Sequence, residues 1–220
     1  EDETEQLINK MRKENKNIKF FPRTRERSLP MSILDGINQS NYDYVMWLDA
    51  DGSMNPDSIK KLILRLDKNS ESMIVGSRFV EGGGYKGIEE VGKTSFISAM
   101  YNVSKSNDSV LATILSKIFN SLLFLLTPTN VKDLTSGFIV GKKDYIDSGV
   151  FEKSYYGDYF VYLIYSLYKK DIEIIEVGYL CEMRIHGESK TGSNIIQLIK
   201  RGLPYISAAV RCRMGINENI

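Results

Sequence analysis

Val45-Met46-Trp47-Leu48-Asp49-Ala50-Asp51 is the stretch that decides the fold, because an apolar run ends abruptly in two carboxylates. The apolar and aromatic residues from Tyr44 to Leu48 predict a buried strand of an open α/β sheet. The two acids would point to one face where this strand leaves the sheet, which is where such sheets bind ligands. Paired carboxylate oxygens suit Mg²⁺ or Mn²⁺. From this stretch alone, a solvated Asp-rich turn is an equally good interpretation.

Composition restricts the class of partner. The 220 residues carry 29 basic and 28 acidic side chains, so no overall positive field would attract nucleic acid. Two cysteines, Cys181 and Cys212, and one histidine, His186, give neither a zinc spacing nor a disulfide framework, which favours a reducing cytosolic setting. We find no cleavable signal and no apolar run long enough to span a bilayer.

Helix and strand patterns alternate along the first eighty residues. The predicted order is a helix from Thr4, a strand over 18–21, a helix from Ser28 to about Asn38, the acid-ended strand 44–49, a helix from Asn55 and a strand over 73–79. This alternation predicts a mostly parallel sheet with helices on both faces, a three-layer α/β/α architecture.

The second half adds an excursion and three helices. Residues 81–109 are rich in Gly, Ser and Asn and predict a flexible loop. Helix 111–126 has a strongly apolar face, which either packs in the core or lies in a membrane interface. A helix over 158–169 and strands within 172–183 follow. The last helix, 194–214, carries enough basic residues to hold an anionic surface weakly: Lys200, Arg201, Arg211 and Arg213.

Two motif matches are rejected. Residues 87–94 match the P-loop pattern, but residues 81–86 separate them from the preceding strand. Two glutamates inside the motif would also sit among phosphate oxygens. An EF-hand loop starting at Asp49 fails because Met54 stands where glycine is required.

Four motifs carry a resemblance in this order: Leu48-Asp49-Ala50-Asp51, Gly76-Ser77-Arg78, Asp133-Leu134-Thr135-Ser136-Gly137-Phe138 and Arg184-Ile185-His186-Gly187-Glu188-Ser189-Lys190. Together they resemble the polyprenol-phosphate mannosyltransferases (dolichyl-phosphate mannose synthases) of glycosyltransferase family 2. The resemblance covers nearly the whole chain. It implies a GT-A fold, a nucleotide-sugar donor of the GDP-mannose or UDP-glucose type, Mg²⁺ or Mn²⁺, and a polyprenyl phosphate acceptor at the cytoplasmic face of a membrane.

The resemblance also implies roles for single residues. Asp49 and Asp51 become the metal and diphosphate ligands, with Asp51 catalytic. Arg78 and Arg184 become contacts to the acceptor phosphate. Other substrate-binding positions in the matched motifs are Ser136, which precedes a strand of the sugar pocket, and His186, Ser189 and Lys190. Helix 111–126 becomes an interface helix.

Charge considerations support these roles. A metal held by Asp49 and Asp51 would neutralise the charge that develops on the departing β-phosphate, and His186 and Lys190 could assist. A phosphate-monoester acceptor, with a second pKa of about 6, is largely dianionic at neutral pH and needs no general base. Guanidinium groups hold such an anion with bidentate geometry. Asp133, the third catalytic candidate beside Asp51 and Arg78, would orient a cation or the acceptor. It would accept a proton only if the nucleophile is a hydroxyl.

Each of these residues also has an ordinary structural explanation. Arg78 and Arg184 could be surface arginines, and His186 could satisfy a loop. Residues 133–137 could be an Asx-type turn. The joint occurrence of the four motifs favours the functional interpretation.

The sequence departs from the family pattern at its start. Family members begin with a strand that ends in a Pro-Thr-Tyr-Asn-Glu-like turn and a second strand that ends in acids binding the nucleotide, and both are absent here. We therefore expect the first strand–helix–strand unit to be missing, and residues 1–220 to be unstable or inactive alone. The family's glycine before the second helix is Ser28, and no arginine stands near residues 110–112.

The overall prediction is a single GT-A catalytic domain over residues 1–220 that transfers mannose or glucose to a polyprenyl phosphate with inversion. One alternative is the same fold transferring sugar to a hydroxyl of a glycan or lipid. Another is a degenerate module that binds without turnover.

Overall fold

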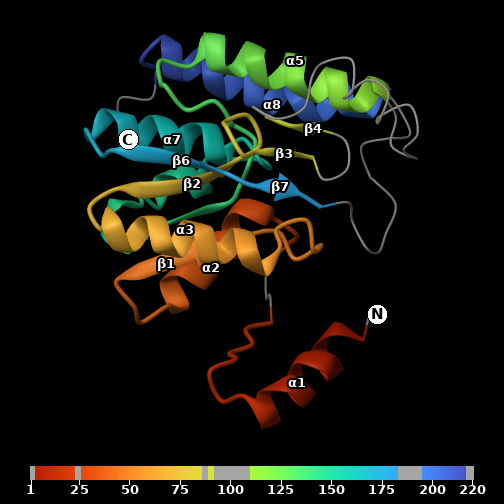
Figure 1. The fold of residues 1–220 in the computed structure, drawn as a ribbon, viewed down its shortest axis with the longest axis vertical. Coiled ribbons are helices and arrows are strands. Elements are labelled where there is room, and N and C mark those ends of the chain that lie inside the picture. The colour runs from red at the N-terminus through yellow and green to blue at the C-terminus, as the bar shows by residue number, and fades with distance from the viewer. Residues whose placement is uncertain (1–2, 23–25, 86–88, 92–109, 183–194, 217–220) are drawn as a thin grey trace.

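The computed structural model describes residues 3–22, 26–85, 89–91, 110–182 and 195–216 (Figure 1). Its centre is a four-stranded sheet in the order β1 (Tyr44–Trp47), β5 (Ile139–Lys142), β2 (Met73–Ser77) and β6 (Ile174–Gly178). Strands β1, β2 and β6 share one direction, as the alternating pattern predicted. Strand β5 runs antiparallel to both of its neighbours, so the sheet is mixed.

Helices cover both faces of this sheet. Helix α3 (Pro56–Lys68) lies on one face. On the other lie α2 (Leu29–Gln39), α6 (Gly149–Glu152) and α7 (Tyr159–Lys169), with α5 (Val110–Leu126) and α8 (Ile195–Arg213) side by side beyond α7 (Figure 1). A short 3-10 helix, η1 (Lys143–Tyr145), follows β5. The predicted three-layer α/β/α architecture is confirmed.

The period-two alternation of strand side chains fills both interfaces. In β1, Val45 packs toward α2 and α7, whereas Met46 packs toward α3. In β2, Met73 and Val75 face the first layer and Ile74 faces the second. Every residue of β2 is buried, so both faces of this strand are covered, which explains why its sequence is a nearly continuous apolar run.

Side-chain caps begin α2 and α3 where the sequence predicted them. The hydroxyl of Ser28 accepts a hydrogen bond from the N–H of Met31 at 3.3 Å, and Asn55 Oδ1 accepts one from the N–H of Ser58 at 2.8 Å. Each cap of this kind contributes about 1 kcal/mol. Because Asn55 fixes the first residue of α3, it also fixes the length of the turn that carries the two acids after β1.

A second, smaller sheet joins β4 (Glu89–Glu90), β3 (Gly84–Tyr85) and β7 (Leu180–Cys181). The predicted flexible loop over 81–109 therefore contains two short strands, and residues 92–109 lie outside the described residues. The glutamates of the P-loop match form β4, which pairs antiparallel with β3. This hairpin supports the rejection of a phosphate-binding loop.

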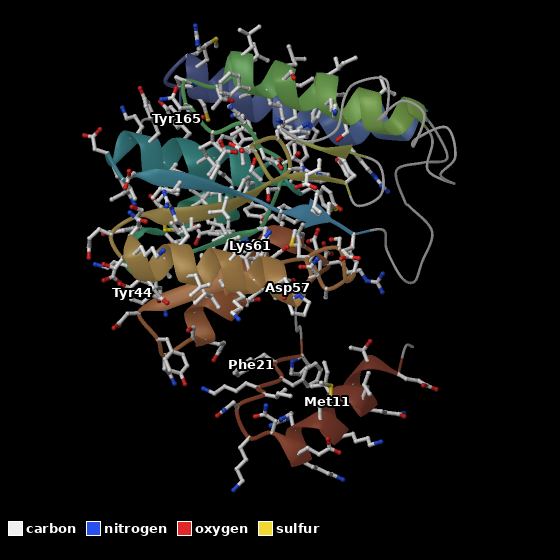
Figure 2. The ribbon with its side chains drawn as sticks, viewed as in Figure 1. Met11, Phe21, Tyr44, Asp57, Lys61 and Tyr165 are labelled. Atoms are coloured by element: carbon white, nitrogen blue, oxygen red, sulfur yellow. The ribbon has the colours of Figure 1, made fainter. Side chains whose placement is uncertain are left out.

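The N-terminal segment stands apart from the rest of the described chain (Figures 1 and 2). Helix α1 (Thr4–Glu14) forms as predicted but buries no residue, and Leu7, Met11 and Phe21 are all about half exposed or more. The predicted strand over 18–21 is wrong, because these residues have no regular structure. The physical reason is the lack of a neighbouring strand within the described residues, since a strand needs a partner for its backbone groups.

Candidate active site

Asp49 and Asp51 lie in the turn between β1 and α3, as predicted. Asp49 is exposed and Asp51 is half-buried. Oδ1 of Asp51 accepts a hydrogen bond from the N–H of Ser53 at 3.0 Å, and Gly52 between them has φ of +78°, which an L side chain rarely adopts. The Asx-type turn is therefore real, and it fixes the orientation of the Asp51 carboxylate.

The end of β7 brings the second sheet to this turn. The N–H of Glu182 donates to the carbonyl of Ser53 at 2.9 Å, and Asn55 Nδ2 donates to Glu182 Oε1 at 2.8 Å. Burial raises the pKa of the neighbouring Cys181 thiol, the charge of Arg78 lowers it, and the charges of Asp51 and Asp133 raise it. Cys181 lies opposite Tyr85 where β7 pairs with β3 (Gly84–Tyr85), and the Tyr85 hydroxyl accepts a hydrogen bond from Arg78 at 3.3 Å. The fold therefore brings the turn of Asp51 into one region with Arg78 and Asp133.

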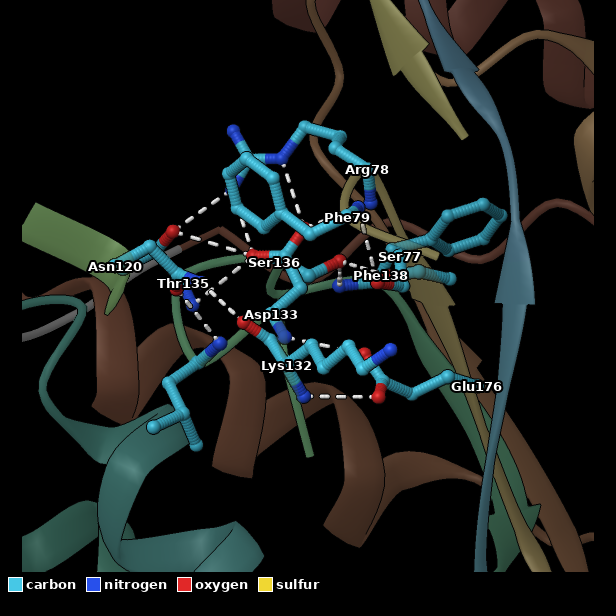
Figure 3. A network of polar contacts seen from close by, with 12 residues as sticks. Ser77, Arg78, Phe79, Asn120, Lys132, Asp133, Thr135, Ser136, Phe138 and Glu176 are labelled. Carbon is cyan, nitrogen blue, oxygen red and sulfur yellow. Dashed lines mark hydrogen bonds and ion pairs between the residues drawn. The ribbon is translucent and has the colours of Figure 1, made fainter. Parts of the chain in front are cut away.

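Arg78 and Asp133 form a buried, bidentate ion pair (Figure 3). Arg78 Nη2 donates to Asp133 Oδ1 at 2.8 Å, and Arg78 Nε donates to Oδ2 at 2.9 Å. The Asp133 side chain is fully buried and that of Arg78 is 14% exposed. Burial alone would lower the pKa of Arg78, but the charges of Asp133 and Tyr85 outweigh it and hold the pKa well above its ordinary value. Arg78 is a permanent cation whose direction is fixed.

The Asp133 carboxylate has more donors than this pair. Oδ2 also accepts from the backbone N–H of Arg78 at 2.9 Å, and Oδ1 accepts from both the N–H and the hydroxyl of Thr135 at 3.3 Å. These donors from Arg78 and Thr135 contact both oxygens of the Asp133 carboxylate, which is therefore arranged to orient Arg78.

Aromatic rings complete the setting of the Arg78 guanidinium. Its Nη1 donates to the Tyr85 hydroxyl at 3.3 Å. Its central carbon lies 5.3 Å from the centre of the Phe79 ring and 5.8 Å from that of Tyr85, distances typical of cation–π contacts. The prediction that Arg78 contacts a phosphate stays a prediction, and the guanidinium is already positioned by its protein partners.

Two side chains that sequence reasoning missed hold the loop around Asp133 (Figure 3). Glu176 of β6 accepts from the N–H of Lys132 at 2.8 Å and from that of Asp133 at 3.1 Å. Asn120 of α5 donates to the carbonyl of Lys132 and accepts from the N–H of Leu134 at 3.0 Å. The peptide groups on both sides of Asp133 are thus fixed by an amide from one helix and a carboxylate from one strand.

Signals for these two residues were present in the sequence. Glu176 is a single acid in the apolar run of β6, and burial raises its pKa, although hydrogen bonds from Lys132, Ser77 and Asp133 lower it. Asn120 lies in the strongly apolar helix α5 and is only 4% exposed. A polar residue inside a strongly apolar helix indicates a buried hydrogen-bonding partner.

Ser136 and Gly137 connect this loop to the sheet. The Ser136 hydroxyl donates to the carbonyl of Gly76 and accepts from the N–H of Phe138 at 3.3 Å. Gly137 has φ of +65°, and a Cβ there would come within 3.2 Å of the Tyr159 hydroxyl. This turn leads directly into β5, and the predicted contact of Ser136 with substrate stays a prediction.

Comparison with known proteins identifies the family of this domain. The model for the family described as "Glycosyl transferase family 2" matches residues 1–149. The chain belongs to glycosyl transferase family 2. A dolichol-phosphate mannosyltransferase of Pyrococcus furiosus is 27% identical to it over 184 residues, covering 83% of this chain and 46% of that protein. The chain therefore spans about half the length of this relative. Family membership confirms the predicted GT-A fold.

The last motif of this family 2 chain falls beyond the described residues. Arg184, His186, Ser189 and Lys190 all lie within residues 183–194, which are not described. Their predicted contacts with substrate stay predictions. Glu182, the last described residue before them, lies beside the turn that carries Asp51.

The two acids after β1 have the chemistry that a hard divalent cation requires. Asp49 and Asp51 offer hard carboxylate oxygens, the ligands that Mg²⁺ prefers. Within the ranges that the structure describes, no group of three or more His, Cys, Asp or Glu side chains forms a metal site. The prediction that Asp49 and Asp51 bind Mg²⁺ or Mn²⁺ stays a prediction.

Proposed function

We propose that residues 1–220 form a GT-A catalytic domain of an inverting hexosyltransferase, which moves mannose or glucose from a nucleotide sugar to a polyprenyl phosphate. The observation that carries the proposal is that hydrogen bonds through β7 and β3 connect the turn of Asp51 to the Arg78–Asp133 pair, in a chain of glycosyl transferase family 2. The name of the Pyrococcus relative supports the choice of donor and acceptor.

Asp49 and Asp51 would hold Mg²⁺ or Mn²⁺ together with the donor diphosphate. The bound metal would neutralise negative charge on the leaving nucleotide. The Asx turn at Gly52 supports this role, because it aims the Asp51 carboxylate before the donor arrives.

The surroundings of Asp133 favour a phosphate acceptor over a hydroxyl acceptor. A hydroxyl nucleophile would need a general base, and the Asp133 carboxylate is occupied by donors from Arg78 and Thr135. A dianionic phosphate needs a fixed cation instead of a base. Arg78 would supply part of that positive charge, and Arg184 would supply a direct contact.

The outer face of α5 supports a place for this domain at the membrane surface. Ile118, Leu122 and Leu125, at helical spacing, are 60%, 40% and 72% exposed. The partner helix α8 packs on α5 through an edge-on contact between the rings of Phe119 and Tyr205, whose centres are 5.9 Å apart. Exposed basic residues of α8 suit anionic lipids: Lys200, Arg211 and Arg213. We propose peripheral binding to the cytoplasmic face.

None of the helices in the described part of the chain has both the length and the apolar character needed to traverse a bilayer.

The test uses the protein as its gene encodes it, with vesicles that contain a polyprenyl phosphate. Radiolabelled GDP-mannose and UDP-glucose are supplied separately, with Mn²⁺, and we expect label from one donor to enter the lipid fraction. Asp51→Asn should abolish transfer while keeping the Oδ1 acceptor of the turn. Asp57→Asn, at an exposed position in the first turn of α3, is the matched control and should stay active.

Other outcomes of the assay would select the alternatives. Label in a hydroxyl-bearing glycan or lipid, with none in the polyprenyl phosphate, would show the same fold acting on another acceptor. Donor binding without transfer to any acceptor, unchanged by Asp51→Asn, would indicate a binding module.

A further inference from the structure

The guanidinium of Arg78 has five N–H donors, and its protein partners use four of them. Nε and one N–H of Nη2 bind the Asp133 carboxylate, and the other N–H of Nη2 donates to the Thr135 hydroxyl at 2.7 Å. Nη1 donates to the Tyr85 hydroxyl at 3.3 Å, and its second N–H has no acceptor among the residues that the structure describes. Arg78 therefore has one N–H for a ligand, whereas a bidentate contact with phosphate needs two.

The Tyr85 hydroxyl has a proton that can serve as the second donor. A phenol hydroxyl both donates and accepts, and this one accepts the hydrogen bond from Nη1 of Arg78. Within the described ranges, its own proton goes to no acceptor. Because the hydroxyl accepts a bond from a cation, its O–H is polarised and becomes a stronger donor. The two donors that remain lie on atoms 3.3 Å apart.

The fold holds Tyr85 beside Arg78. The segment that joins them passes so close to the end of β2 that a Cβ at Gly83 would clash with the carbonyl oxygen of Ser77. Tyr85 then lies in β3, which pairs with β7 and places Tyr85 opposite Cys181 (Figure 1). The Tyr85 ring also stacks near the cation, with its centre 5.8 Å from the central carbon of the guanidinium. The hydroxyl is therefore positioned by a strand and by a ring contact.

The same strand pairing places the two donors near the turn of Asp51. Cys181 lies opposite Tyr85, and the next residue, Glu182, donates its N–H to the carbonyl of Ser53 at 2.9 Å. Ser53 is two residues after Asp51 and donates its own N–H to that carboxylate. The donors thus belong to the candidate active site.

Both donors keep access to solvent. The Arg78 side chain is 14% exposed and Tyr85 is half-buried. The Asp133 carboxylate contacts Arg78 through Nε and Nη2, so Nη1 is the guanidinium nitrogen outside this ion pair. Partial burial strengthens a hydrogen bond to an anion, because less water screens it.

We propose that the Tyr85 hydroxyl and the remaining N–H of Arg78 together bind one phosphate group of a substrate, which makes Tyr85 a substrate-binding residue. Two adjacent donors suit a ligand that offers two oxygens on one atom, as a phosphate does. The inference rests on the proposed function, whose substrates supply two such groups. These are the monoester of the lipid acceptor and the diphosphate of the nucleotide sugar.

Tyr85→Phe is the direct test, because it removes the hydroxyl and keeps the ring beside Arg78. Titration calorimetry on the protein as its gene encodes it uses two probes, a water-soluble short-chain polyprenyl phosphate and the nucleoside diphosphate of the donor. We expect the dissociation constant of one probe to rise about tenfold and that of the other to stay unchanged, which identifies the phosphate bound. Tyr42→Phe, at a tyrosine that is 76% exposed, is the matched control and should change neither.

A purely structural role for Tyr85 predicts the opposite sign. Without the phenol hydroxyl, Nη1 of Arg78 has two N–H groups without protein acceptors, so the guanidinium alone could hold a phosphate and the affinity should stay or increase. An unchanged or lower dissociation constant for both probes in Tyr85→Phe, with an unaltered melting temperature, would overturn the proposal. Equal weakening of both probes would also overturn it, since that indicates a general disturbance of the site.

Kinetics supply a second measurement. In the transfer assay, the KM of the probe that Tyr85 binds should rise about tenfold at unchanged kcat, because the contact is present in both the ground state and the transition state. A wild type that binds neither probe would refute the phosphate site. A wild type that transfers no sugar, but whose phosphate binding is still weakened by Tyr85→Phe, would refute the proposed function and support this site.

Discussion

Replacing Asp133 with asparagine should destabilise the fold severely, because it leaves the charge of Arg78 buried without its counter-ion. Asparagine keeps the volume and one acceptor oxygen, so the change removes little but the charge. Breaking a buried pair by removing one partner costs about 3–5 kcal/mol. Since Arg78 keeps 14% exposure, we expect the lower end, about 3 kcal/mol. For a domain of this size, that loss corresponds to a melting temperature lowered by about 6–12 °C.

The assay is urea denaturation followed by Trp47 fluorescence, for the wild type, Asp133→Asn, Arg78→Met and the double variant. Removing both partners eliminates the unpaired charge, so the double variant should be more stable than the sum of the two single losses predicts. Asp144→Asn, on the short 3-10 helix after β5, is the control and should change the free energy of unfolding by less than about 0.5 kcal/mol. A loss below about 1 kcal/mol for Asp133→Asn, or strictly additive losses, would refute the argument that this pair is buried and coupled.

Three further predictions each concern a single side chain. Asn120→Ala removes the hydrogen bond to the carbonyl of Lys132 and leaves the buried N–H of Leu134 without this acceptor, so it should cost about 2 kcal/mol in urea denaturation. Ser121→Ala, at an exposed neighbour, should be neutral. Burial raises the pKa of Glu176 above 4.5, so the protonated side chain favours the folded state. Its contribution to the free energy of unfolding is fully present below pH 4.5 and is lost as pH rises through the pKa of the folded state. Glu176→Gln should remove this pH dependence of stability, and an unchanged dependence in the variant would contradict the prediction. Leu125→Glu should weaken flotation with anionic vesicles at unchanged melting temperature, because this side chain is 72% exposed.

Local signals were enough to predict most elements of the fold. The caps at Ser28 and Asn55 and the apolar run before Asp49 act within a few residues, so the sequence reveals them directly. Residues 18–21 have strand-like composition but remain irregular, because strand formation depends on a neighbour that composition cannot show. The direction of β5 was not predicted for a similar reason, since it depends on where residues 130–138 are held.

The candidate site was predicted as a set of residues but not as a set of contacts. Motif spacing located Asp51, Arg78 and Asp133, and the fold brings them into one region. Motif spacing could not show that the Asp133 carboxylate already accepts hydrogen bonds from Arg78 and Thr135. Pairing between segments more than fifty residues apart is a tertiary property, and a single sequence contains no periodicity that encodes it.

The amide of Asn120 links two surfaces that would otherwise be unrelated. Ile118 and Leu122 lie on the exposed side of α5, and two residues from each of them Asn120 holds the peptide groups on both sides of Asp133. A translation of α5 by even a fraction of a hydrogen-bond length must therefore strain these bonds or displace the carboxylate that aims Arg78. The position of α5 and the orientation of the Arg78 guanidinium are therefore coupled through the side chain of Asn120. A bilayer that changed the depth of α5 would thereby change the direction of a charge in the interior.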